Sequence, residues 1–354
     1  MSNKILGFDG VRALAVISVV ATHYGLFHEI DVESGLSDYL PLVHGGTGVQ
    51  AFFILSGFLI TSLLIGEQHR NSRISIKNFI IRRSLRIFPL YILVLVLSTL
   101  IYLFLDSDIS GVSLVYAYTY IYNFIPLEHY SSLLGHTWSL AVEEHFYLIW
   151  PLFFSFLFPS KRKLLLFFVT LFMVASLLVY YFLIKYGVDK SYFIGRWSFV
   201  AGYNIAGGCL AALLLVNTSE SGKLRICLAT NVSFLVGVFF YGNSLYLHTG
   251  YYFIDDVISV YLRFSGILII LVWIYLNQSS RLVKILEISA LRYIGTISYG
   301  VYMYQGLLLS TGPNRVPGNN WPVSPELGLL LLVIIAPLSF HFFEKPFLRI
   351  KSKF

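Results

Sequence analysis

The stretch VRALAVISVVATHYGLF, residues 11–27, is the first of a series of long apolar blocks that decide the fold. The chain has 354 residues, of which 57% are hydrophobic and 12% charged, whereas soluble domains are about 45–50% apolar and about 25% charged. Blocks of about 20 apolar residues are long enough to cross a bilayer. The sequence therefore predicts an all-α, polytopic integral membrane helical bundle, organised as a single membrane domain over residues 1–354.

The positions of the apolar blocks predict the number of crossings. Spans begin near residues 11, 48, 86, 138, 164, 197, 226, 260, 292 and 326, which makes ten. A short, tyrosine-rich stretch at 112–125 is either an eleventh span or a segment at the membrane surface. If it does not cross and the N-terminus is cytoplasmic, 20 of the 25 Lys and Arg residues lie on the cytoplasmic side, as the positive-inside rule requires. We therefore predict about ten transmembrane helices with both termini cytoplasmic.

Charge and cysteine content narrow the possible partners. We attribute the net charge of +7 to this bias of the loops, so the lipid bilayer is an expected partner and nucleic acid is not. The two cysteines, Cys209 and Cys227, lie in apolar stretches and have neither a metal-binding spacing nor a disulfide framework. No metal site is expected.

The first span carries two ionisable residues, Arg12 near one end and His23 eleven positions later. Eleven residues place them within about 20° of each other around the helix and about 16 Å apart along it. Arg12 alone is explained by an anchor at the membrane edge. An ionisable residue inside the membrane is costly and usually functional, and histidine exchanges a proton near neutral pH. We therefore interpret His23, past the middle of the membrane, as a functional residue.

The second span, GVQAFFILSGFLIT at residues 48–61, contains the pair Ser56-Gly57. Small residues in an apolar helix favour close packing against another helix. Alternatively, a hydroxyl or a backbone amide at this position lines the path of a substrate. The residues alone leave both interpretations open.

The segment IRRSLRIFPLY, residues 81–91, presents a cluster of arginines. Arg82, Arg83 and Arg86 are related by three- and four-residue spacings, which place them on one cationic face of a helix. They either anchor the helix on the cytoplasmic side or bind phosphate, whose oxygens match the guanidinium fork.

The segment HTWSLAVEEHFYLIWP, residues 136–151, contains two adjacent carboxylates inside an apolar span. Glu143 and Glu144 lie about 8–9 Å deeper along the helix than Trp138. Trp138 is explained by the aromatic belt at the membrane surface. Each carboxylate must be protonated, paired with a cation or exposed to a wet cavity, so we favour a functional role for this pair.

Together these segments resemble the bacterial membrane acyltransferase-3 family, whose members O-acylate cell-surface carbohydrates. Arg12 and His23 match the family's pattern of Arg or Lys, ten residues and then His. The strings FFILSGFL, RRSLRIFPLY and WSLAVEEHFYLIWP match its motifs FFxxSGFL, RRxxRIxPxY and WSLxxEEQFYLxWP, with His145 where glutamine is usual.

Two later segments extend the resemblance, which covers residues 7–349. ISYGVYMYQG is similar to the family's SYxxYLxH motif through Ser298, Tyr299 and Tyr302, but Gln305 replaces the final histidine. FEKPFLRIKSKF is similar to the closing E-[RK]-P segment through Glu344, although a basic cytoplasmic tail explains it equally well. Many family members carry an esterase-like domain after the membrane part. Because this sequence ends at residue 354, we expect a stand-alone membrane domain.

The resemblance implies an enzyme of the bacterial cytoplasmic (inner) membrane. It would transfer an acyl group, most simply acetyl, from cytoplasmic acyl-CoA to a hydroxyl of an exported carbohydrate. Acyl-CoA would then be a donor substrate and not a permanently bound cofactor.

The resemblance and the chemistry together assign residues to roles in that reaction. We expect His23 to act as the general base and Glu143 to orient its imidazole. Arg12 is expected to be a further catalytic residue, and Arg12, Ser56 and Trp138 are equal candidates for stabilising the oxyanion. The residues expected to contact the donor are Arg82, Arg83, Arg86 and Ser56, and those expected to contact the acceptor are Trp138, Glu144 and Tyr299.

Two rival functions remain open. Ionisable residues inside a helical bundle also fit a transporter, either proton-coupled or for a lipid-linked sugar, although the sequence lacks the paired halves that many transporters have. The chain is alternatively a non-catalytic subunit of polysaccharide assembly, in which Gln305 would mark the loss of activity. The intact pairs Arg12–His23 and Trp138–Glu143 argue against that second rival.

Overall fold

The computed structural model describes residues 5–25, 45–105, 107–216, 222–246, 253–309, 321, 324–351 and 353–354. Within these residues the chain is predominantly helical, and its only strand-like feature is one isolated antiparallel bridge between Pro126 and Tyr192. The α-helices are α1 (Phe8–Tyr24), α3 (Gly45–Asn71), α4 (Ile76–Phe104), α5 (Gly111–Tyr118), α6 (Thr137–Lys185), α7 (Ser198–Ala201), α8 (Tyr203–Leu215), α9 (Gly222–Leu228), α10 (Asn231–Tyr246), α11 (Ser259–Leu276), α12 (Arg281–Leu286), α13 (Ser289–Leu309), α14 (Pro325–Ser339) and α15 (Lys345–Lys351). Shorter 3₁₀ or π turns are η3 (Tyr122–Phe124), η4 (Leu127–His129), η5 (Val188–Lys190), η6 (Ile194–Arg196), η8 (Phe253–Ile258) and η9 (Phe340–Glu344).

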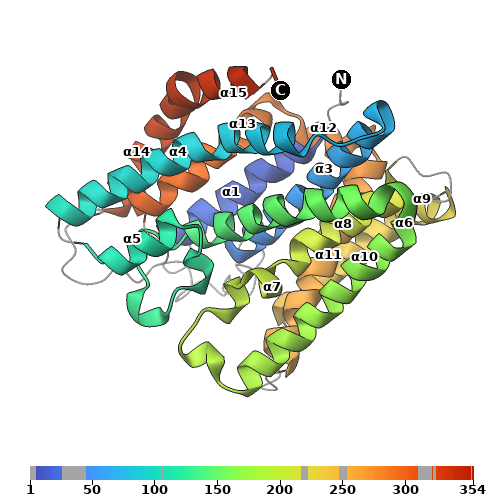
Figure 1. Cartoon of the computed structure of the whole chain (residues 1–354), viewed down its shortest axis with the longest axis horizontal. Helices are drawn as coiled ribbons and strands as arrows, with labels where there is room; N and C mark the ends of the chain where they lie inside the picture. The colour runs from blue at the N-terminus through green and yellow to red at the C-terminus, as the bar shows by residue number, and fades with distance from the viewer. Residues whose placement is uncertain are drawn as a thin grey trace.

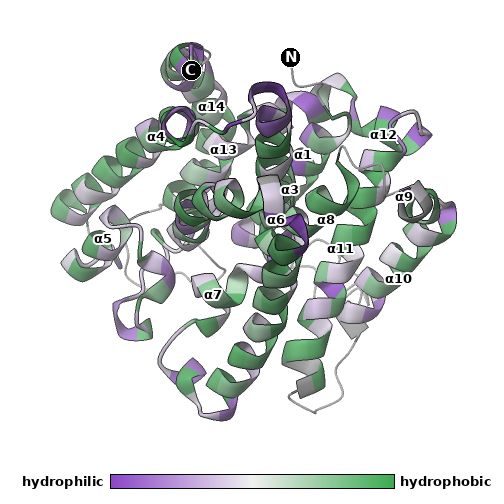
Figure 2. Ribbon diagram, turned by 45° about the vertical axis from the view of Figure 1, so that its right-hand side comes forward, coloured by the Kyte–Doolittle hydropathy of each residue, from purple (hydrophilic) through white to green (hydrophobic). Residues whose placement is uncertain are grey.

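The all-α membrane fold predicted from the sequence is confirmed. Seven helical segments among the described residues are long and apolar enough to cross a membrane. They are Gly45–Asn71, Ile76–Phe104, Thr137–Phe158, Ser160–Lys185, Ser198–Leu215, Ser259–Leu276 and Pro325–Lys351. Hydrophobic residues cover most of the length of these helices, and hydrophilic residues gather towards their ends, as at the turn between α3 and α4 (Figure 2).

The other three predicted spans also coincide with helices. Helices α1 and α10 contain 17 and 16 residues, so each is only about 25 Å long at 1.5 Å per residue. Helix α13 has 21 residues, but polar side chains interrupt its apolar character. The count of ten crossings therefore stays a prediction. The uncertain stretch at 112–125 forms α5 and η3, and the eight residues of α5 are too short to cross a hydrocarbon core of about 30 Å.

Two consecutive spans, Thr137–Phe158 and Ser160–Lys185, are joined without a loop. Helix α6 continues for 49 residues, and its backbone leaves helical geometry at Lys161, where φ is −128° and ψ is 41°. The basic KRK sequence thus lies at the bend between two spans, as the sequence predicted. The two ends of the chain lie on the same side of the bundle, because Ile5 and Lys351 line the same cavity. An even number of crossings would place both ends on one side. The prediction that this side faces the cytoplasm stays a prediction.

Helices α1 and α3 occupy the centre of the bundle. Helices α4, α13, α14 and α15 flank them on one side, and α8, α10 and α11 flank them on the other (Figure 1). Glycines permit the closest approach in this core. A Cβ at Gly57 of α3 would collide with the backbone carbonyl of Ile205 in α8, and a Cβ at Gly208 would collide with that of Ile54. The packing interpretation of the Ser56-Gly57 pair is therefore correct for Gly57, and it fixes the rotation of α3 next to the candidate site.

Candidate active site

A cavity of about 350 Å³ lies inside the bundle between α1, α3, α4, α6 and α13. Four of its lining side chains are basic and three are acidic. The basic residues are Arg12, Arg83, Arg86 and Lys351, and the acidic residues are Asp9, Glu143 and Glu144. Because charged groups inside a membrane protein are costly unless they are paired or hydrated, seven of them around one cavity mark a functional site.

The two ionisable residues of α1, Arg12 and His23, lie at different heights in the bundle. Arg12 lines the cavity and forms an ion pair with Asp9 one turn earlier, with 3.0 Å between Nη1 and Oδ1. His23 is not among the cavity-lining residues, and its Nδ1 lies 2.5 Å from Oε1 of Gln305 in α13. The two residues that match one sequence motif therefore lie in different surroundings, separated by about 16 Å of helix.

The arginine motif of α4 divides between two cavities. Arg83 and Arg86 line the central cavity, as predicted. Arg83 also lies over the rings of Phe79 and Tyr147, with its Cζ 5.6 Å and 5.4 Å from their centroids. This contact fits a cation held against aromatic faces.

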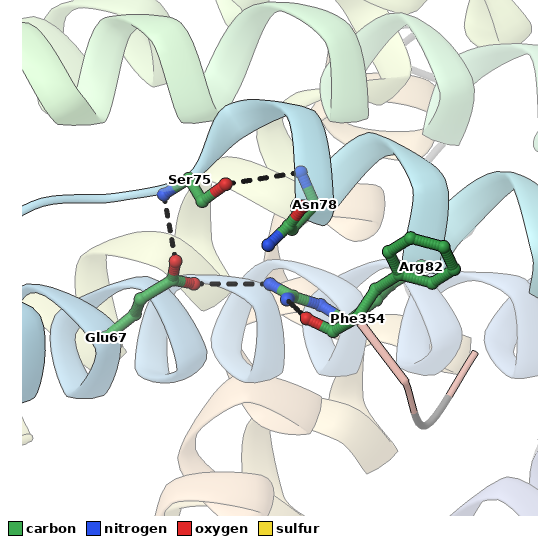
Figure 3. Close-up of polar contacts among 5 residues, drawn as sticks. All are labelled: Glu67, Ser75, Asn78, Arg82 and Phe354. Atoms are coloured by element: carbon green, nitrogen blue, oxygen red, sulfur yellow. Dashed lines mark hydrogen bonds and ion pairs between the residues drawn. The ribbon is translucent and has the colours of Figure 1, made fainter. Parts of the chain in front are cut away.

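Arg82 does not line the central cavity with Arg83 and Arg86, and its predicted contact with the donor stays a prediction. Arg82 lines a second cavity of about 1070 Å³, and its guanidinium lies 3.2 Å from Oε2 of Glu67 in α3 and donates to the carbonyl of Phe354 at 2.8 Å. Figure 3 shows Glu67 holding both Arg82 and the backbone N–H of Ser75 at the start of α4. Arg82 therefore joins α4 to α3. The two cavities adjoin, because Arg83 and Lys351 line both.

The carboxylate of Glu143 is held by two hydroxyl groups. Ser56 Oγ donates to its Oε1 at 2.5 Å, and the hydroxyl of Tyr147 donates to its Oε2 at 3.1 Å. Ser56 thus lines the cavity, as its functional interpretation required, while the adjacent Gly57 packs against α8. The sequence analysis missed Tyr147, although it follows Glu143 by four residues and so lies on the same face of α6.

The predicted pairing of Glu143 with His23 is not found. Both oxygens of Glu143 are engaged by Ser56 and Tyr147, and the imidazole meets Gln305 instead. Helix α6 explains the difference, because Glu143 lies about 10 Å along the helix from His136, the residue of that segment whose ring is near His23.

The remaining predicted contact residues have mixed surroundings. Glu144 lines the cavity, and its Oε1 is buried without a hydrogen-bond partner among the described residues. Tyr299 also lines the cavity, but its hydroxyl donates to the carbonyl of Ile87 at 2.7 Å and so ties α13 to α4. Trp138 does not line it and packs edge-on against Phe53, with centroids 5.7 Å apart.

Two hydroxyl groups line the part of the cavity that adjoins His136. Ser139 and Tyr302 both line it, and their oxygens lie 2.6 Å apart. The hydroxyl of Tyr302 also lies 3.1 Å from the backbone carbonyl of His136. His136 opens the quoted segment 136–151, yet the sequence analysis gave it no role. Its presence in the same apolar segment as Glu143 and Glu144 was the sequence signal that could have identified it.

Comparison with known proteins gives a consistent result. A family model described as an acyltransferase domain matches residues 5–342. A Bacillus subtilis protein, YrhL, whose name assigns it provisionally as a peptidoglycan O-acetyltransferase, is 31% identical over 97% of this chain and 54% of its own length. The peptidoglycan O-acetyltransferase OatA of Listeria monocytogenes is 28% identical over 96% of this chain and 55% of its own.

The O-acetyltransferase OatA of Staphylococcus aureus is 27% identical over 96% of this chain and 56% of its own length. The chain therefore spans about half the length of the curated relatives it matches. No solved structure matches it.

Proposed function

Because this chain belongs to the family of acyltransferase domains, we propose that it is a membrane O-acyltransferase. It transfers an acetyl group from acetyl-CoA to a hydroxyl of a cell-surface carbohydrate. The names of its relatives favour the glycan of peptidoglycan as the acceptor. The proposal places the chain in the bacterial cytoplasmic membrane, with both termini in the cytoplasm.

The observation that carries the proposal is the charge arrangement of the central cavity. Arg12, Arg83, Arg86 and Lys351 line it together with Glu143 and Glu144. A CoA thioester carries several phosphates, and guanidinium groups bind phosphate oxygens well because their N–H fork matches the geometry of the anion. The basic side chains therefore suit the phosphorylated end of the donor.

The chemistry needs a base, because a carbohydrate hydroxyl is a poor nucleophile while it keeps its proton. A positioned histidine accelerates such a step by about 10²–10⁴-fold, and we assign this role to His23. The hydroxyls of Ser139 and Tyr302 line the part of the cavity that adjoins His136. Of the three expected oxyanion donors, Arg12 and Ser56 line the same cavity, and we keep these two as the groups that would donate hydrogen bonds to the oxyanion.

The remaining residues have supporting roles in this mechanism. Ser56 and Tyr147 hold Glu143 in place beside the cationic groups. We assign Glu143 to the donor side of the site, where its charge would help to hold Arg83 and Arg86 in position for the donor.

A proton-coupled transporter would use a similar cavity, so the decisive experiment is a test of group transfer. Purified protein in detergent is incubated with radiolabelled acetyl-CoA and soluble peptidoglycan glycan fragments. An acyltransferase moves the label to the glycan in an alkali-labile ester and releases one CoA thiol for each ester formed. Absence of transfer over a range of acceptor concentrations would overturn the proposal and favour the transporter.

A further inference from the structure

Three polar side chains from different helices lie next to the end of the central cavity that Ser139 and Tyr302 line. They are His23 of α1, His136 at the start of α6 and Gln305 of α13. Oε1 of Gln305 lies 2.5 Å from Nδ1 of His23. His136 and Gln305 are 2% and 0% exposed. The ring of His136 lies directly against Gly306, where a Cβ would collide with it. The three side chains therefore form one compact cluster, which we call the histidine–glutamine cluster.

Several atoms of this cluster are buried without a protein partner. Among the described residues, neither ring nitrogen of His136 nor Nε2 of Gln305 makes a hydrogen bond. Buried polar groups are nearly always paired, and an unpaired one costs about 1–3 kcal/mol. Three such atoms in one place indicate a polar ligand that satisfies them. Burial, helped by the nearby His23, lowers the pKa of His136 to about 3; the carbonyl of Leu133, which is close to the ring without completing a hydrogen bond, opposes this shift. His136 is therefore neutral and offers one N–H donor and one acceptor.

The contact with Gln305 also determines which nitrogen of His23 is basic. An amide oxygen accepts hydrogen bonds and cannot donate them, so Nδ1 of His23 carries the proton. In the neutral ring the accepting lone pair is then on Nε2. A partner that fixes the tautomer in this way is the usual means of orienting a functional histidine.

We infer that the histidine–glutamine cluster binds the acceptor alcohol, with Gln305 as the positioning residue that holds His23 with its proton on Nδ1. This inference rests on the proposed function. The ligand class is a carbohydrate alcohol, because its neighbouring oxygens accept the unpaired N–H groups of Gln305 and His136. Ser139 and Tyr302 lie between this cluster and the central cavity, so the two substrates meet there.

The transfer step balances with these groups alone. Nε2 of His23 takes the hydroxyl proton while the alcohol oxygen bonds to the acyl carbon. The bond between carbon and sulfur then breaks, and the departing thiolate receives the proton from the imidazolium. The products are the carbohydrate ester and CoA with a free thiol.

Kinetics of two Gln305 variants separate the two roles of this side chain. Gln305→Met keeps the size but loses the amide, and misplacement of the base is expected to lower kcat about 100-fold with an unchanged KM for acetyl-CoA. Gln305→Glu keeps an accepting oxygen but loses the N–H donors, so kcat recovers while the KM for the glycan fragments rises about tenfold. His136→Phe raises the same KM. The matched control is Gln50→Met, which removes another glutamine, hydrogen-bonded to Tyr203, and should change neither constant.

A spectroscopic measurement tests the tautomer without any turnover. In protein labelled with ¹⁵N-histidine, the His23 signal is identified by its loss in His23→Asn, and it should show a protonated Nδ1 in the wild type and a changed pattern in Gln305→Met. A proton on Nε2 in the wild type, or kinetics of Gln305→Met equal to those of Gln50→Met, overturns the inference. If the wild type transfers no acetyl group at all, the proposed function fails, whereas transfer that is indifferent to Gln305 and His136 removes only this inference.

Discussion

Replacing Arg86 by alanine should weaken the binding of acetyl-CoA and leave the chemical step nearly intact. Arg86 lines the central cavity, and no ion pair of this residue is found within the described part of the chain. The other cations there are partly engaged, because Arg12 pairs with Asp9 and Arg83 lies over two aromatic rings. Arg86 is therefore the arginine of this cavity with the most to gain from a phosphate.

The magnitude follows from the strength of hydrogen bonds to charged groups. Such bonds contribute about 1.5–3 kcal/mol, and each 1.4 kcal/mol is about a factor of ten in affinity. If KM reports donor binding, Arg86→Ala should raise the KM for acetyl-CoA by about 10- to 150-fold. The lower end is expected, since three other cations remain at the cavity.

The assay is initial-rate transfer of labelled acetyl groups by purified protein at varied acetyl-CoA and saturating glycan fragments. The matched control is Arg292→Ala, which removes an exposed arginine of α13 that lines neither cavity. The control should keep the wild-type KM. Equal KM values for the two variants would remove Arg86 from the donor site, and a loss confined to kcat would show that it acts on the reaction and not on binding.

Three further predictions test other parts of the site. Arg82→Ala should change the KM for acetyl-CoA less than about threefold, because its guanidinium is committed to a structural ion pair. An increase in KM as large as that of Arg86→Ala would show that Arg82 also binds the donor. Gly57→Ala should lower the free energy of unfolding by about 1–3 kcal/mol, because its Cβ meets the carbonyl of Ile205. Thermal unfolding in detergent measures this. An equal effect of Gly242→Ala, where an added Cβ would meet no neighbouring side chain or helix within 4 Å, would refute it. Glu143→Gln should lower kcat about 100-fold or more with normal accumulation in the membrane, and full activity would exclude a role for its charge.

The sequence predicted the membrane class and the helical segments because these depend on local composition. Apolar blocks of sufficient length allow one fold class, and the KRK sequence coincides with the bend of α6 at Lys161. The lengths of α1 and α10 could not be predicted as well, since the ends of apolar runs say little about where the helical backbone stops.

The choice of partners within the site was harder to predict because it depends on how whole helices are rotated. Arg82 and Arg83 are adjacent in sequence, so their side chains diverge by about 100° around the helix. Arg83 lines both cavities, whereas Arg82 lines only the second, where it pairs with Glu67 of another helix. In the same way, the predicted partner of His23 was Glu143, but the observed one is Gln305.

Tyr147 is the one partner that local reasoning could have supplied. It follows Glu143 by four residues on α6, and its hydroxyl donates to that carboxylate at 3.1 Å. Spacings within one helix can thus be read from the sequence, whereas contacts between helices need the structure.

The proposed positions of the two substrates, the thioester at the basic central cavity and the alcohol at the histidine–glutamine cluster, imply that they enter the bundle from opposite ends. Purified protein is reconstituted into sealed vesicles that enclose glycan fragments, labelled acetyl-CoA is added outside, and the label on the enclosed glycan is measured against vesicles that contain His23→Ala. The account predicts esters on the enclosed glycan for the wild type and none for the variant, with all of the CoA product outside. Labelling that occurs only when donor and acceptor share one side of the membrane would contradict it.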